Sequence, residues 1–170
     1  APQVFDLDPM QTFVQFEVLH FDTSTLRGRI GPVRGEVMLD PEAGRGRVGL
    51  VIDMRTLDTG FRLLDARLRQ PDLLDVGGHP EAWFVAERFR FEQGQPVELR
   101  GEFTLRGIGA PLTLRALRFG CRAATGPAPQ RCGGDFEGEL QRSRFGASFG
   151  LPLVADRVRL LVQAEGLLRR

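Results

Sequence analysis

Alternation of apolar and polar residues is the main pattern along this chain. From Pro96 to Arg106, apolar residues or glycine occupy every second position, and charged residues or threonine fill the positions between them. From Thr12 to His20, the residues Val14, Phe16 and Val18 form a similar apolar face. A period of two residues is typical of a strand with one buried and one solvated face.

Further segments repeat this pattern less regularly: 33–40, 47–54, 82–91, 112–121, 135–140 and 158–165. The last of them also allows a helix, and we choose a strand because apolar and charged residues alternate there. Clusters of Gly, Pro and Asp separate several of these segments, as they do at turns. The pattern predicts about eight or nine strands.

One stretch, 59–74, departs from the alternation. Phe61, Leu64 and Leu68 recur at helical spacing among charged residues, and Pro71 then starts a new turn. No internal repeat or linker interrupts the chain. We therefore predict a mainly β fold in which residues 1–170 form one domain: a single extended antiparallel barrel with one inserted amphipathic helix. Closing the barrel would leave few edge strands unpaired.

Composition and charge narrow the class of protein. The 170 residues are 42% hydrophobic and 26% charged, as in an ordinary folded soluble protein. The 23 basic and 22 acidic residues nearly cancel, which argues against a broad electrostatic surface for nucleic acid. No apolar stretch approaches the roughly 18 residues of a membrane helix.

The two cysteines, Cys121 and Cys132, flank a turn-forming Gly-Pro-Ala-Pro segment. Antiparallel flanks would bring the sulfurs together, so we predict a structural disulfide, with two free thiols as the alternative. A disulfide would place the chain outside the cytoplasm. The start Ala1-Pro2-Gln3, without Met, is consistent with a processed N-terminus and a periplasmic or secreted protein.

Two short motifs resemble catalytic or cofactor signatures. Residues 44–49 match GxGxxG, but a strand-like segment follows where dinucleotide binding requires a helix. Residues 146–150 match the GxSxG motif around Ser148, but Leu151-Pro152 follows, and both histidines precede the serine. We therefore predict no catalytic residues, no catalytic cofactor and no enzyme activity, and we keep a Ser148 esterase as an alternative.

Three polar residues lie in unusual places. His20 ends an apolar strand face, where it would be a hydrogen-bonded core histidine or a residue at the barrel mouth. His79 precedes Pro80 in a turn, and with His20 it completes no zinc pattern, so we predict no metal site. Glu87 shares a predicted face with Trp83, which requires either solvent or an arginine partner there.

Short sequence segments, taken in their order and spacing across nearly the whole chain, resemble the YceI-like family of periplasmic polyisoprenoid-binding proteins. The matching segments are Phe5-Asp6-Leu7-Asp8, Val18-Leu19-His20, Gly28 to Gly35, Leu57-Asp58-Thr59-Gly60, Asp65 to Arg69, Leu73 to Val76, Phe103 to Ile108 and Arg142 to Gly146. The resemblance implies a lipocalin-like barrel whose interior holds an isoprenoid chain. Arg144 stands where the family usually has an acidic residue, and Met10-Gln11 stand where it usually has His-Ser.

The resemblance and the strand pattern together suggest which residues contact a ligand. An eight-stranded barrel either fills with its own side chains or holds one small ligand. The candidate ligand-binding residues are Val14, Phe16, Val18, His20, Trp83, Val85, Phe89, Phe103 and Leu105. The alternative is that they fill an ordinary packed core.

We therefore expect a non-catalytic protein that carries or stores a polyisoprenoid or quinone-like lipid. A transient contact with a membrane and a homodimer are both compatible with this role. The main alternative is a filled barrel that binds a protein partner of a membrane redox or stress system.

Overall fold

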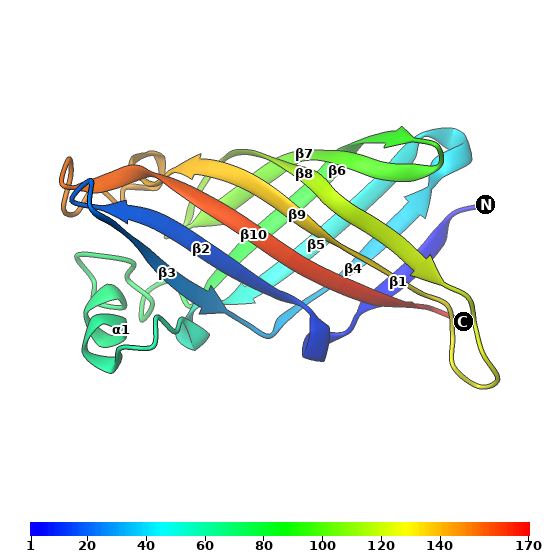
Figure 1. Cartoon of the computed structure of the whole chain (residues 1–170), viewed down its shortest axis with the longest axis horizontal. Helices are drawn as coiled ribbons and strands as arrows, with labels where there is room; N and C mark the ends of the chain where they lie inside the picture. The colour runs from blue at the N-terminus through cyan, green and yellow to red at the C-terminus, as the bar shows by residue number, and fades with distance from the viewer.

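The computed structural model describes residues 1–170, and most of the chain is β-structure. Its elements are β1 (Gln3–Leu7), β2 (Phe13–His20), β3 (Ser24–Ile30), β4 (Val33–Asp40), β5 (Arg45–Asp53), α1 (Arg62–Leu68), β6 (Glu81–Glu92), β7 (Gln95–Leu105), β8 (Ile108–Arg122), β9 (Arg131–Gln141) and β10 (Val154–Leu168). All ten strands belong to one antiparallel sheet (Figure 1). The predicted mainly β fold is confirmed.

The sheet closes into a barrel because β1 pairs on both of its edges. It binds β4 through Gln3–Asp6 and the end of β10 through Phe5–Leu7. Eight strands, β1 and β4 to β10, therefore form the closed ring. Closure gives the backbone N–H and C=O groups of these strands partners on both sides, which a free sheet edge would lack.

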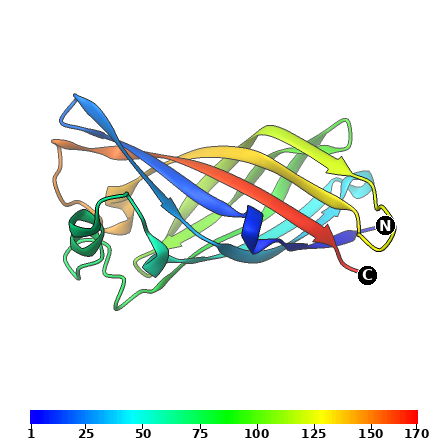
Figure 2. The ribbon, with the colours of Figure 1, turned by 60° about the horizontal axis from the view of Figure 1, so that its bottom comes forward.

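The strands β2 and β3 extend the sheet beyond β10. A 3-10 turn at Pro9–Gln11 interrupts the chain between β1 and β2, so β2 pairs with the first part of β10 and β1 with its end. Asp8 stabilises this turn by accepting a hydrogen bond from the backbone N–H of Met10 at 3.0 Å. Figure 2 shows the hairpin of β2 and β3 reaching the end of the molecule that carries α1, with the turn between the two strands at that end.

The inserted helix is shorter than the predicted stretch. α1 covers seven residues and ends before Pro71, since the position preceding a proline disfavours helical geometry. Leu68 is buried and Leu64 packs against the core, whereas Phe61 lies exposed before the first turn. No helix in the structure combines the length and hydrophobicity that crossing a bilayer would require.

The predicted disulfide is confirmed at the end of the barrel opposite α1. Cys121 and Cys132 are directly opposite each other on β8 and β9, with Cα atoms 4.0 Å apart. Cys132 is also buried among Phe5 and Leu39. The disulfide therefore closes the β8–β9 hairpin and contributes to the small hydrophobic cluster beside it.

Removing this disulfide should destabilise the protein moderately. We expect the pair of substitutions Cys121→Ala and Cys132→Ala to lower the free energy of unfolding by about 2–3 kcal/mol, because the closed loop is short. Urea unfolding with and without a reductant measures this effect. The reductant should lower the midpoint of the unchanged protein and leave that of the double variant unaltered. Equal stability of the two proteins without reductant would contradict the prediction.

Candidate functional site

An apolar cavity of about 120 Å³ lies inside the barrel at the α1 end. Inward-facing residues of three strands, β2, β7 and β10, form much of its wall. They are Val14, Phe16, Val18, Phe103, Leu105, Val158 and Leu160. They alternate along their strands with residues that face outward, as the pleat requires. All but one of the lining residues are hydrophobic.

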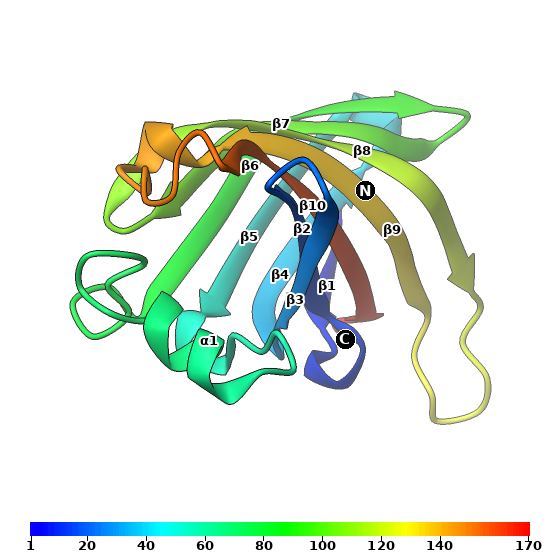
Figure 3. The same ribbon diagram turned by 60° about the vertical axis from the view of Figure 1, so that its left-hand side comes forward.

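The segment between β5 and β6 covers this end of the barrel. Leu57, Leu68 and Leu74 from this segment line the cavity. The buried Asp65 orders the approach to α1, because its carboxylate accepts hydrogen bonds from the backbone N–H of Thr59 at 2.8 Å and from its hydroxyl at 2.6 Å. This segment lies beside the end of β3 (Figure 3), and Asp58 within it forms a two-way backbone bridge with Arg29 of β3.

Arg142 is the one charged residue in the cavity wall. Its guanidinium donates hydrogen bonds to backbone carbonyls of the loop before β10 and of the start of that strand. The acceptors are Ala147 O at 2.7 Å, Phe149 O at 2.6 Å, Val154 O at 2.7 Å and Ala155 O at 2.8 Å. Burial lowers the pKa of this guanidinium, and the nearby Asp156 acts in the opposite direction. Arginine stays charged in proteins, so a cation bound only by carbonyls holds the loop at the cavity.

A second apolar cavity, of about 70 Å³, lies toward the disulfide end. Phe5, Leu39, Phe89 and Cys132 are among its lining residues. The two cavities share no lining residue, although they follow each other along the same strands. On β10, for example, Leu160 lines the larger cavity and Val162 the smaller one. Packed side chains therefore divide the barrel interior into two parts.

Six of the nine candidate ligand-binding residues face the interior. Val14, Phe16, Val18, Phe103 and Leu105 line the larger cavity. Phe89 lines the smaller one, so the structure does not bring all six to one cavity.

The prediction that Trp83 and Val85 line the interior is wrong. They are 39% and 49% exposed on the outer wall, and Ala82, Phe84 and Ala86 face inward instead. The cause is a β-bulge, in which Glu87 is an extra residue on β6 relative to β7. The bulge exchanges the two faces of β6, so Phe89 beyond it points inward. Glu87 is exposed to solvent, which removes the need for a buried partner.

His20 is exposed at the end of β2 and lines neither cavity. Its ring stacks on Phe21, with ring centroids 4.3 Å apart. The core position considered for this histidine is therefore wrong, as is its placement among the lining residues. Phe21 begins the turn after β2 with a φ of 53°, so both rings lie where the chain leaves the strand.

The two short motifs lie outside helical contexts. In the GxGxxG motif, Gly44 adopts a left-handed conformation, with φ of 65°, at the β4–β5 connection, and β5 follows it. Ser148 is exposed in the loop before β10, and its hydroxyl hydrogen-bonds neither His20 nor His79. The structure therefore gives this serine no basic partner.

Sequence reasoning missed two features of the site. Phe84 does not appear among the predicted residues because the prediction assigns the alternate positions, Trp83 and Val85, to the inner face of β6. The sequence analysis assigns Arg142 no role of its own and names it only within a segment that resembles the family. Its burial depends on carbonyls that lie 5 to 13 residues further along the chain. No local pattern signals such a contact.

An antiparallel barrel closed around apolar cavities, with a short helix covering one end, defines the lipocalin-like class of fold. The YceI-like domain family matches residues 5–166, and the chain belongs to this family. A UPF0312 protein of Pseudomonas paraeruginosa is 28% identical over 98% of this chain and 87% of its own length. Protein YceI of Salmonella newport is 26% identical over 98% of this chain and 86% of its own length.

Solved structures show the same fold at low identity. BcnA of Burkholderia cenocepacia superimposes with a TM-score of 0.73 and 20% identity, covering 94% of this chain and 99% of its own. A polyisoprenoid binding domain from Saccharophagus degradans, implicated in plant cell wall breakdown, gives a TM-score of 0.68 and 13% identity, covering 97% and 98%. These likenesses extend over the whole barrel.

Proposed function

We propose that this protein binds an isoprenoid or isoprenoid-quinone lipid in the barrel interior and carries or stores it without chemical change. The observation that carries the proposal is the larger cavity, whose wall is hydrophobic except for Arg142. Such a wall favours an apolar ligand over water, because unpaired polar groups would be costly there. The solved polyisoprenoid binding domain with the same fold supports this choice of ligand class.

The cavity volumes indicate how much ligand fits without movement. An apolar cavity of about 150 Å³ stays dry and binds a molecule the size of benzene. The larger cavity, at about 120 Å³, is therefore of the size that holds about one isoprene unit without movement. Burying the five carbons of each unit contributes roughly 3–4 kcal/mol before the costs of association. A longer chain would have to part the side chains between the two cavities.

The disulfide supports a location outside the cytoplasm as part of the same proposal. Cys121 and Cys132 form the bond that oxidising compartments preserve. A periplasmic or secreted protein would also have access to membrane lipids. The proposed location and the proposed ligand are therefore consistent with each other.

The divided interior is the observation that favours the alternative function, a filled barrel that binds a protein partner. Native mass spectrometry of the purified protein, followed by organic extraction, separates the two. We expect a stoichiometric isoprenoid, or one farnesol per chain after addition of farnesol. A protein that is empty and does not take up farnesol would contradict lipid binding and favour the partner-binding module.

A substitution that fills the larger cavity should block the ligand. We expect Val18→Phe to weaken farnesol binding about ten-fold or more, because the new ring occupies space that the ligand needs. The matched control is Val85→Phe, which adds the same ring on the outer wall. Titration followed by native mass spectrometry measures both variants. Equal weakening in both, or in neither, would contradict a ligand site at Val18.

A further inference from the structure

Large apolar side chains are exposed around the mouth of the larger cavity. They come from the β2–β3 turn, the start of α1 and the loop before β10, which lie at the same end of the barrel (Figure 3). These side chains are between 37% and 73% exposed. We call them the apolar rim: Phe21, Phe61, Leu63, Leu151 and Leu153.

The rim is continuous with the cavity wall. In the loop before β10, Phe149 and Val154 line the cavity, and Leu151 and Leu153 between them are exposed. In the same way, Leu68 of α1 lines the cavity, whereas Phe61 and Leu63 at the start of this helix are exposed. The backbone N–H of Phe21 donates to Leu153 O at 2.7 Å, which joins the β2–β3 turn to this loop. Short segments therefore connect the inside of the barrel with the exposed surface of the mouth.

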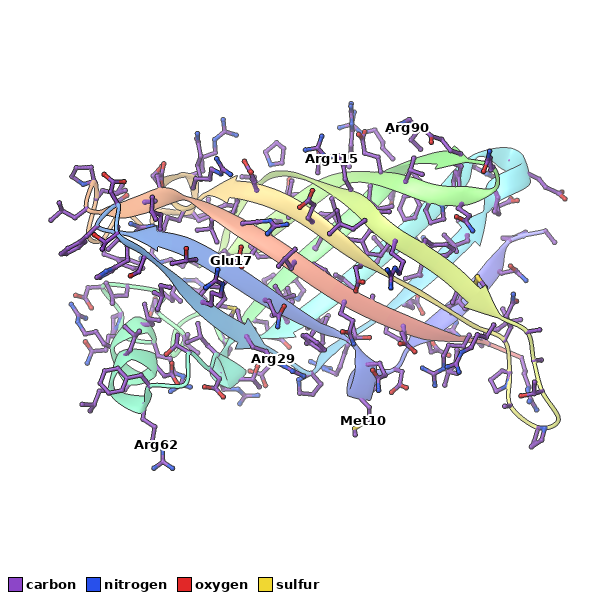
Figure 4. All side chains as sticks on the ribbon, in the orientation of Figure 1. Met10, Glu17, Arg29, Arg62, Arg90 and Arg115 are labelled. Atoms are coloured by element: carbon purple, nitrogen blue, oxygen red, sulfur yellow. A yellow bond between two sulfur atoms is a disulfide. The ribbon has the colours of Figure 1, made fainter.

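The rim carries little charge in a chain with 26% charged residues. Residues 147–153 contain no ionisable side chain. Arg62 lies between Phe61 and Leu63, is exposed, and points away from the barrel (Figure 4). Asp22, exposed next to Phe21 in the β2–β3 turn, is the one carboxylate beside a rim residue in the sequence, and it would stay at the level of the headgroups. Few charges would thus be desolvated if this end entered an apolar phase. The aliphatic stem of Arg62 could enter the apolar phase beside Phe61 and Leu63, while its guanidinium stays at the level of the lipid phosphates.

The opposite end of the barrel has a different surface. It consists of the termini and the hairpin turns at 40–45, 92–95 and 122–131, and no large apolar side chain is exposed there. Glu42, Arg45, Glu92 and Arg122 are exposed at that end instead. The exposed apolar residues of the rim are therefore a property of the mouth rather than of loops in general.

We propose that the apolar rim docks the barrel, mouth first, on a phospholipid bilayer, and that the lipid ligand passes between the bilayer and the larger cavity there. This inference rests on the proposed function, because a nearly insoluble isoprenoid reaches a soluble carrier from a membrane. Aromatic and leucine side chains insert at the boundary between headgroups and acyl chains. A second copy of the chain on the same surface would instead cover the mouth of the cavity and leave the ligand no way in.

A fluorescent reporter in the rim tests the docking directly. Trp83 is the one tryptophan in the chain, so Trp83→Phe gives a background without tryptophan. Leu153→Trp in this background places the reporter in the rim. The control is Leu117→Trp on the outer wall, where Leu117 is 55% exposed. With vesicles of phosphatidylethanolamine and phosphatidylglycerol that contain brominated lipid, we expect a blue shift and quenching for the rim reporter only. Quenching of both reporters, or of neither, would overturn the proposal.

Loss of rim side chains should weaken vesicle binding. We expect Phe61→Ser and Leu153→Ser each to reduce flotation with these vesicles about ten-fold, and high salt to have little effect because the contact is apolar. Met10→Ser and Leu117→Ser are the controls, since both residues are exposed away from the mouth. Equal binding by the rim and control variants would contradict the proposal.

Farnesol binding in solution separates this proposal from the proposed function. A protein that binds farnesol but not vesicles would overturn docking and leave lipid binding in place. A protein that floats with vesicles but binds no isoprenoid would support docking and overturn the ligand. If the serine substitutions in the rim change a monomer–dimer equilibrium in sedimentation, and leave vesicle binding unchanged, the rim is a contact between copies of the chain and docking is overturned.

Discussion

Replacing Arg142 with leucine is expected to lower the free energy of unfolding by roughly 3–5 kcal/mol and to loosen the cavity mouth. Arg142 is 5% exposed, and its guanidinium binds four backbone carbonyls between Ala147 and Ala155. Each buried carbonyl that loses its donor costs about 1–3 kcal/mol. Part of this cost is offset because the variant no longer has to bury a desolvated cation. Water that enters the opened loop can also donate hydrogen bonds to the freed carbonyls.

Urea unfolding and amide hydrogen exchange measure the effect together. The exchange rates of residues 147–155 should rise more than those of the strands, because the lost hydrogen bonds hold this loop. Arg142→Lys should not restore them, since an ammonium cannot replace the planar set of donors on a guanidinium. Arg144→Leu is the control, because Arg144 is exposed and makes no ion pair. Full rescue by lysine, or an equal effect of Arg144→Leu, would contradict the role assigned to Arg142.

The barrel could be predicted from the sequence because most of its strands have one buried and one solvated face. The alternation over 96–106 and 12–20 corresponds to β7 and β2. β1 and β3 gave no such signal. β1 has five residues, and β3 has two inward apolar residues, Leu26 and Ile30, with Gly28 between them. The strand count of eight or nine therefore falls short of ten.

Gly28 illustrates why β3 could not be recognised locally. It lies opposite Phe16 on β2, and a Cβ atom at this position would come within 2.2 Å of the Phe16 ring. The glycine therefore makes space for an aromatic ring that lines the cavity from the neighbouring strand. The requirement comes from a residue that is distant in the sequence. Alternation within one segment cannot show it.

The candidate site could be predicted only where strands are regular. On β2 and β7 the inward residues are the expected ones, whereas on β6 the bulge at Glu87 reverses the faces. A bulge depends on how two strands pair, so the sequence of one strand does not reveal it. The same holds for the cavity boundary, which depends on how side chains from opposite walls meet.

Replacing Phe84 with alanine is expected to lower the free energy of unfolding by about 3–5 kcal/mol. Phe84 is 1% exposed and lines the smaller cavity, and its neighbour across the β6–β7 pair, Phe103, lines the larger one. Removal of the ring leaves a void where the two cavities approach each other. Phe61→Ala is the control: Phe61 is exposed, so its loss should change the stability by less than about 0.5 kcal/mol.

The same substitution should change which ligand the barrel prefers. With the boundary reduced, a longer isoprenoid can extend from the larger cavity toward the smaller one without displacing Phe84. We expect the affinity for geranylgeraniol relative to farnesol to rise about ten-fold in Phe84→Ala, because the additional isoprene unit gains a buried position. Competition between the two alcohols, followed by native mass spectrometry, measures this ratio. An unchanged ratio in a variant that remains folded would show that the ligand does not cross between the cavities, and that one cavity alone holds it.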